Sequence, residues 1–145
     1  MEVQQLGHVV LKVRDLERSE KFYAEALGLQ VAARMDDPPI TFFTLGNHHD
    51  FAIVAVGHGG PDVSATSPGL AHVAFKVGNS TEELRRAKAH FDALGVKIAA
   101  VLEHTVSQSI YIDDPDGNSI EVYVDTSDVW RTNPAAVATI APLDL

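Results

Sequence analysis

The chain has 145 residues, of which 46% are hydrophobic and 21% charged. Such values are typical of one globular domain and argue against disorder or a membrane-spanning protein. Its net charge of −9, without a basic cluster, argues against a nucleic-acid partner, and the lack of cysteine limits any metal site to histidine, carboxylate and water.

The first half of the chain begins with a predicted strand over Leu6–Val13, in which apolar residues alternate with a face that carries His8. A helix follows, for which Asp15 is a suitable N-cap and Gly28 ends the C-terminus. Three more strands are then predicted between breaks rich in proline, glycine and asparagine, at Leu29–Arg34, Thr41–Leu45 and Asp50–Val56.

The second half repeats this order after a segment rich in glycine, proline, serine and threonine. A strand is predicted over Leu70–Val77, and Ser80 with Glu83 forms a capping box that opens a helix ending at Gly95. Three strands follow, the last two joined by a tight turn over residues 114–118. Their ranges are Val96–Leu102, Ser107–Asp113 and Ser119–Asp125.

Each half therefore reads strand, helix, strand, strand, strand. This order predicts an α+β fold in which two such modules form a curved mixed-sheet half-barrel with the helices outside. We expect a single domain over residues 1–127, made of module one (5–57), a linker (58–69) and module two (70–127). Residues 128–145 show no clear periodicity of apolar residues. We expect them to form a C-terminal tail that packs on the domain or on a neighbouring subunit.

The first strands of the two halves are near copies of one another, and each has histidine at its third residue, His8 and His72. An internal duplication with pseudo-two-fold packing would bring these histidines side by side. In the last predicted strand the apolar residues alternate with Glu121, which places this carboxylate on the polar face. Three metal-capable side chains are therefore expected on one concave surface.

A two-fold site would offer a fourth equivalent position. Glu121 lies 26 residues after Gly95, and the same count from Gly28 reaches Val54, whose neighbour Ile53 is also apolar. We therefore expect no fourth protein ligand. A face of two histidines and one carboxylate suits octahedral Fe(II) or Mn(II), and it leaves positions open for a substrate and dioxygen.

These residues and their repeat resemble the vicinal oxygen chelate superfamily, which includes glyoxalases, bleomycin-resistance proteins and extradiol ring-cleaving dioxygenases. The resemblance covers residues 5–125 and implies paired βαβββ modules. It also implies His8, His72 and Glu121 as metal ligands. Within the superfamily, the chain is most similar to single-domain members of the extradiol dioxygenase type.

Three further residues gain a role from this resemblance. The segment Asn47–Ala52 resembles a His-His-x-x-Ala motif, which implies that His49 acts as acid or base beside the substrate. The aromatic residue before the Asp/Pro/Gly turn implies that Tyr111 hydrogen-bonds a substrate oxygen. His104 corresponds to another active-site histidine of the family, although its spacing to Tyr111 departs from the family pattern.

The resemblance favours an Fe(II)-dependent extradiol dioxygenase, with Mn(II) or another divalent metal as alternatives, acting on a catechol-like substrate with dioxygen. Two other classes stay open: a metal-dependent lyase or isomerase of the glyoxalase or epimerase kind, and a metal-free protein that binds small molecules such as drugs. Lyases of this kind commonly place Glu where the chain has Ile53 or Val54.

We expect no membrane partner and a cytoplasmic protein, since no basic N-terminal patch leads into an apolar segment. We also expect a homodimer. Whether the modules pair within one chain or across two stays open at this point.

Overall fold

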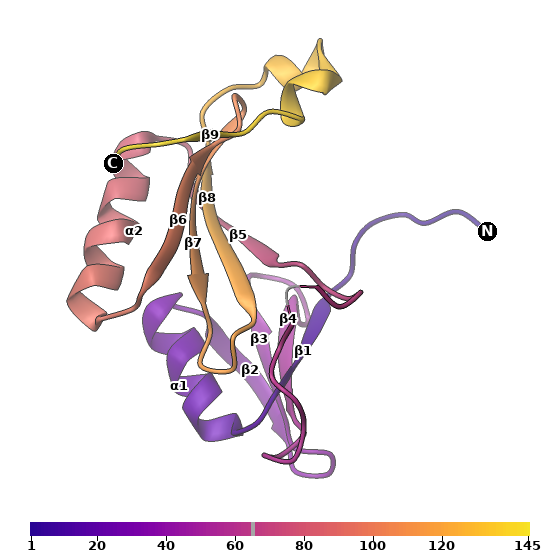
Figure 1. Ribbon diagram of the computed structural model, residues 1–145. Helices are drawn as coiled ribbons and strands as arrows, with labels where there is room; N and C mark the ends of the chain where they lie inside the picture. The colour runs from indigo at the N-terminus through magenta and orange to yellow at the C-terminus, as the bar shows by residue number, and fades with distance from the viewer. Residues whose placement is uncertain (65) are drawn as a thin grey trace. The chain divides into compact units, whose positions relative to one another are not determined.

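Each half of the chain folds into one β-sheet with one α-helix against it, as the computed structural model shows (Figure 1). The structure describes residues 1–64 and 66–145; residue 65, within the predicted linker 58–69, lies outside the described residues. It divides into two compact units, Met1–Ser64 with Pro115–Asn118, and Ala65–Asp114 with Ser119–Leu145. The predicted α+β fold with a repeated element order is thereby confirmed.

The first unit contains one four-stranded sheet, in the order β1-β4-β3-β2. β1 is parallel to β4, whereas β2, β3 and β4 pair antiparallel. Helix α1 packs on β3 and β4, and the Asp15 side chain caps it by accepting a hydrogen bond from the Arg18 amide. The elements are β1 (Val9–Val13), α1 (Leu16–Ala26), β2 (Gln30–Met35), β3 (Ile40–Thr44) and β4 (Phe51–Ala55).

The second unit repeats this arrangement and adds a fifth strand, in the order β5-β8-β7-β6-β9. β5 is parallel to β8, and α2 packs on β5, β7 and β8. Among the described residues, no helix is long and apolar enough to cross a membrane. The elements are β5 (Val73–Gly78), α2 (Thr81–Leu94), β6 (Ile98–Glu103), β7 (Ser107–Asp113), β8 (Ser119–Asp125) and β9 (Ala141–Pro142).

The C-terminal tail, expected to pack on the domain or on a neighbouring subunit, packs on the second unit. Two short 3-10 helices, Val129–Arg131 and Pro134–Val137, lead into β9, which pairs antiparallel with β6. Ala136 is buried. The tail therefore extends the sheet of this unit.

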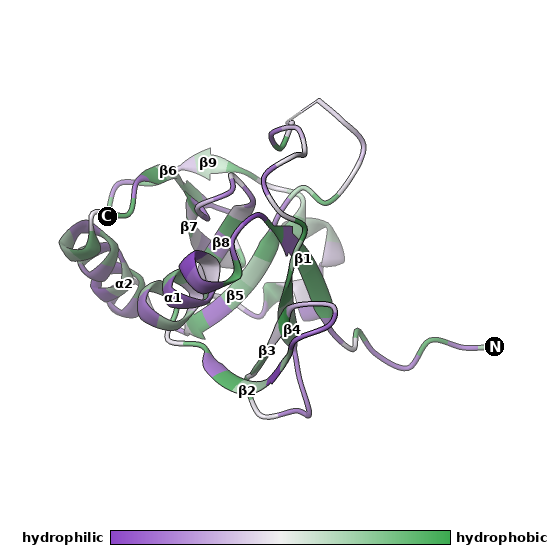
Figure 2. Ribbon diagram, turned by 90° about the horizontal axis from the view of Figure 1, so that it is seen from below, coloured by the Kyte–Doolittle hydropathy of each residue, from purple (hydrophilic) through white to green (hydrophobic). Residues whose placement is uncertain are grey.

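The strands carry most of the apolar residues that the helices cover. In Figure 2, β1 and β4 are largely hydrophobic, whereas both helices show hydrophilic and hydrophobic residues around their circumference. The predicted apolar face of the last strand is confirmed, because Ile120, Val122 and Val124 are at most 1% exposed. Their alternation leaves Glu121 on the opposite face of β8.

The first strand of each unit begins later than the sequence predicts, at Val9 and Val73 instead of Leu6 and Leu70. The cause is the neighbouring strand: Val9 pairs with Phe51, the first residue of β4, so the residues before Val9 lie beyond that strand. His8 consequently precedes β1 and His72 precedes β5, and neither lies within a strand.

A buried carboxylate in the turn 115–118 binds the start of α1. Asp116 accepts hydrogen bonds from the Arg14 amide at 3.0 Å and from the Arg14 and Arg18 guanidinium groups. Its side chain is 4% exposed, and these donors outweigh burial and hold the pKa of its carboxyl below the ordinary 3.8. Arg14 also binds the exposed carboxylate of Asp62 at 2.8 Å.

We expect Asp116→Asn to lower the free energy of unfolding by about 1–3 kcal/mol, because it removes the buried carboxylate that the Arg14 and Arg18 guanidinium groups share. Urea denaturation measures this. Asp62→Asn is the control and should cost below about 0.5 kcal/mol, since Asp62 is 95% exposed.

The difference between the wild type and Asp116→Asn should also depend on pH. Since folding lowers the pKa of Asp116, its stabilisation is fully present above about pH 3.8 and is lost as pH falls further. An equal loss of unfolding free energy in Asp116→Asn and Asp62→Asn would contradict the proposed stabilising role of Asp116.

Candidate metal and catalytic site

Parallel pairing of β1 and β4 brings His8 and His49 together in the first unit. Both residues lie just before their strands, and the Val9 amide donates to the Asp50 carbonyl at 3.2 Å. The ring centroids of His8 and His49 are 4.1 Å apart, and those of His48 and His49 are 4.6 Å apart. Three imidazoles therefore gather at one end of this sheet.

The three histidines form a group that could hold a metal ion, since one ring nitrogen from each lies within 4.8 Å of the others. Sequence reasoning singled out His8 and His49 but gave no role to His48. Partial burial, and then the neighbouring rings of His8 and His48, hold the pKa of His49 below its ordinary value, against the opposing effect of Asp50.

In the second unit, His72 and Glu121 form a close pair. The Nε2 atom of His72 is 3.1 Å from the Oε2 atom of Glu121. Two ligand atoms bound at about 2.1 Å, at right angles around an octahedral metal, are about 3.0 Å apart. The pair therefore has the spacing of two adjacent ligands of one metal ion.

The second oxygen of the Glu121 carboxylate is already engaged. Ser109 donates its hydroxyl proton to Oε1 of Glu121 at 2.5 Å, and both residues are buried. A hydrogen bond of this kind orients a carboxylate ligand and leaves its other oxygen for the metal. The donor set in this unit thus fits a metal ion, with Ser109 as support.

Tyr111 and His104 lie beside this pair. Tyr111 is opposite Glu121 in the β7–β8 register, and its ring meets that of His72 edge to face at 5.6 Å. Its hydroxyl oxygen is 3.3 Å from Nε2 of His104. Burial, and then the Glu121 carboxylate, raise the pKa of Tyr111 to about 12, so it is a neutral phenol at neutral pH.

The residue equivalent to Glu121 in the first unit is Ala52, which corrects the count that reached Val54. Glu121 pairs with Ala74, the second residue of β5, and Ala52 pairs with Val10, the second residue of β1. The count failed because the corresponding strands differ in length: β3 has five residues, whereas β7 has seven. The side chain of Ala52 offers no ligand atom at this position.

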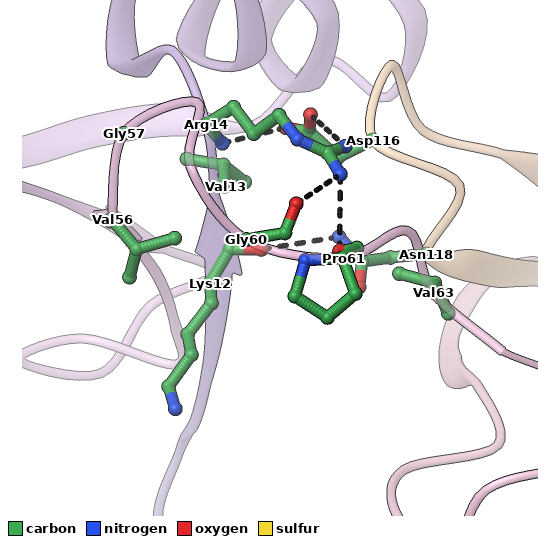
Figure 3. Close-up of a pocket in the computed structure, with 10 residues that line it drawn as sticks. All are labelled: Lys12, Val13, Arg14, Val56, Gly57, Gly60, Pro61, Val63, Asp116 and Asn118. Carbon is green, nitrogen blue, oxygen red and sulfur yellow. Dashed lines mark hydrogen bonds and ion pairs between the residues drawn. The ribbon is translucent and has the colours of Figure 1, made fainter.

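A separate pocket of about 440 Å³ lies in the first unit at the end of β1 (Figure 3). Arg14 closes one wall by donating to the carbonyl oxygens of Gly60 and Pro61. None of the predicted site residues lines it. Its lining comprises Lys12, Val13, Arg14, Val56, Gly57, Gly60, Pro61, Val63, Asp116 and Asn118.

The predicted site residues thus form two groups, one in each compact unit. His8 and His49 lie together in the first unit, and His72, Glu121, Tyr111 and His104 lie together in the second. Sequence reasoning missed the contact of Ser109 with Glu121. The alternation of Ser109 and Tyr111 along one face of β7 was the available signal.

The chain thus contains a duplicated α+β fold with a histidine just before the first strand of each unit, and one of these histidines, His72, lies beside the buried carboxylate of Glu121. The profile of the Glyoxalase/Bleomycin resistance protein/Dioxygenase superfamily matches residues 5–122. The chain belongs to this superfamily, as its resemblance implied.

Relatives within the superfamily carry different activities. The chain is 30% identical over 122 residues to biphenyl-2,3-diol 1,2-dioxygenase 3 of Rhodococcus globerulus, covering 83% of this chain and 63% of that protein. It is also 30% identical over 122 residues to a lactoylglutathione lyase of Neisseria meningitidis, covering 80% of this chain and 87% of the lyase. Identity alone therefore does not separate dioxygenase from lyase.

A solved structure supports the fold. The glyoxylase/bleomycin resistance protein/dioxygenase domain from Frankia sp. EAN1pec superposes with a TM-score of 0.73 at 24% identity, covering 86% of this chain and 99% of that domain.

We expect Ser109→Ala to weaken binding of Mn(II), used as a probe metal, by about tenfold, because the Glu121 carboxylate loses its orienting donor. Competition titration against a chelator measures the affinity. Ser107→Ala, on the same strand, is the matched control and should bind like the wild type. Equal affinity of wild type and Ser109→Ala would show that Ser109 does not support a metal ligand.

Proposed function

We propose that the chain is an Fe(II)-dependent extradiol-type dioxygenase that opens the ring of a catechol-like substrate, with His8, His72 and Glu121 as metal ligands. The observation that carries this proposal is the His72–Glu121 pair, 3.1 Å apart and supported by Ser109. Ala52, the counterpart of Glu121 in the first unit, offers no ligand. Three protein ligands leave room for a substrate with two adjacent oxygens and for dioxygen.

When bound, the metal would polarise the substrate oxygens and bring substrate and dioxygen together. In this proposal His49 takes a proton from a substrate hydroxyl and later returns one, because a neutral imidazole offers an acceptor nitrogen near neutral pH. Its contact with His8, at 4.1 Å between ring centroids, places it beside a proposed ligand.

Tyr111 has a different part in this proposal. Its raised pKa, about 12, keeps the phenol neutral, so it can share a hydrogen bond with a substrate hydroxyl without adding a negative charge to a site that already contains Glu121. Ser109 keeps the Glu121 carboxylate oriented.

A lyase or isomerase is the second candidate, favoured by the length match to the lactoylglutathione lyase, of which the chain covers 87%. A lyase of the glyoxalase kind would use a carboxylate to move a proton. Ala52 stands at the position equivalent to Glu121 and offers none, which favours the dioxygenase.

The activity is tested by loading the protein with Fe(II) without oxygen, adding a panel of catechols, admitting air and recording coloured product and oxygen uptake. We expect one oxygen molecule consumed per ring opened. Iron-loaded protein that leaves every catechol intact would overturn the proposal. Turnover of a hemithioacetal with Ni(II) or Zn(II) and without oxygen uptake would support the lyase instead.

His49→Asn should lower kcat about 10²- to 10⁴-fold at unchanged iron content, because it removes the group proposed to move protons. His72→Ala should lose iron as well as activity. His58→Ala is the control, since His58 is exposed in the segment after β4, and it should keep both. Steady-state kinetics with iron analysis on each preparation separates loss of the metal from loss of the base.

A further inference from the structure

The turn between β6 and β7 has an unusual backbone next to His104. Among the described residues that are not glycine, Thr105 is the one with a positive φ, at 63°. The Val106 amide donates to the His104 carbonyl at 2.7 Å, which closes a tight three-residue turn centred on Thr105. A β-branched residue rarely adopts this conformation, and turns of this kind persist where surrounding contacts hold them.

The C-terminal tail supplies such contacts. The hydroxyl oxygen of Thr139 is 2.8 Å from that of Thr105 and 3.2 Å from the carbonyl oxygen of Ala136. β9 follows directly and pairs with β6, with Ala141 opposite Glu103. The Thr139 hydroxyl and the pairing of β9 with β6 therefore both hold the tail against this turn.

The same residue of the tail determines which nitrogen of His104 carries the proton. The Thr139 carbonyl oxygen lies 2.8 Å from Nδ1 of His104. A carbonyl can only accept a hydrogen bond, so Nδ1 must be the donor. In the neutral ring Nε2 is then a bare acceptor, and the Tyr111 hydroxyl at 3.3 Å donates its proton to it.

Donation of the Tyr111 hydroxyl proton to His104 affects what Glu121 can bind. Tyr111 has one hydroxyl proton and lies opposite the Glu121 carboxylate across β7 and β8. The Glu121 carboxylate is a competing acceptor for this proton, and its hydrogen bonding is one cause of the raised pKa of Tyr111. A phenol that donates to the carboxylate would compete with a metal for it, whereas a phenol that donates to His104 would not. A phenol oxygen that donates its proton keeps lone pairs that can accept a hydrogen bond from a substrate hydroxyl.

We propose that Thr139 is a positioning residue, which fixes His104 in the Nδ1–H tautomer and thereby directs the Tyr111 proton to His104. This inference rests on the proposed function for the roles of Tyr111 and Glu121. A substrate hydroxyl proton can pass to Tyr111 as the proton of Tyr111 passes to His104, which becomes an imidazolium still bonded to Thr139. Thr139 lies outside residues 5–122, the part that the superfamily profile matches.

Long-range ¹H–¹⁵N NMR of the metal-free chain, residues 1–145, with ¹⁵N-labelled histidine tests this directly, with His104→Gln to assign the signals. We expect the Nδ1–H pattern for His104 in the neutral wild type. Thr139→Val removes the hydroxyl that holds the tail against the turn and should lower the ratio of Nδ1–H to Nε2–H by about threefold, the effect of one hydrogen bond.

Three further variants make the result specific. Thr139→Ser keeps the hydroxyl and should restore the wild-type pattern, and Thr132→Val alters another tail threonine and should not change it. Thr105→Val should shift the ratio in the same direction as Thr139→Val and by no more, because it removes the Thr105–Thr139 contact but keeps the contact of Thr139 with the Ala136 carbonyl. Nε2–H as the main form in the wild type, or a Thr139→Val spectrum equal to the wild type, would overturn the inference.

Kinetics with Fe(II) and catechol then separate the two proposals. If the proposed function holds, Thr139→Val should lower kcat with KM and iron content unchanged. An iron-loaded wild type without activity, but with His104 as the Nδ1–H form, overturns the dioxygenase and supports the tautomer assignment.

Discussion

The parallel pairing of the first strand with the last strand of each module is the constraint on which the candidate site depends. These strands are far apart in the sequence, yet β1 lies beside β4 and β5 beside β8. A residue just before the first strand therefore meets residues around the start of the last one. In the first unit this brings His8 to His49, and in the second it brings His72 to Glu121. The same register with different residues therefore brings together a different pair of side chains in each unit.

Much of the fold was predictable because its signals are local. The N-cap Asp15, the capping box of Ser80 with Glu83 and the alternation around Glu121 depend on residues within one turn or one strand, and the structure confirms all three. The register was less accessible, because it depends on the lengths of the strands as well as of the loops, and β3 is two residues shorter than β7. Counting from the glycines therefore reached Val54 instead of Ala52.

The interactions that the sequence did not reveal join residues far apart in the chain. The segment with Asp116 is a typical tight turn, and nothing local shows that its carboxylate binds Arg14, 102 residues earlier. Likewise, the apolar residues of the C-terminal tail follow no helix or strand periodicity. The contact of Thr139 with His104, 35 residues earlier, depends on the pairing of β9 with β6. Such contacts follow from tertiary packing, which local propensity does not encode.

The short strand β9 also changes how one sheet ends. Without it, β6 would present a row of unpaired amides and carbonyls, the kind of edge on which another chain can add a strand. β9 covers the end of this row at Leu102 and Glu103, and one of its two residues is Pro142, which has no amide proton to offer a further strand. The tail therefore closes one end of this edge, where a further strand can no longer pair with Leu102 and Glu103.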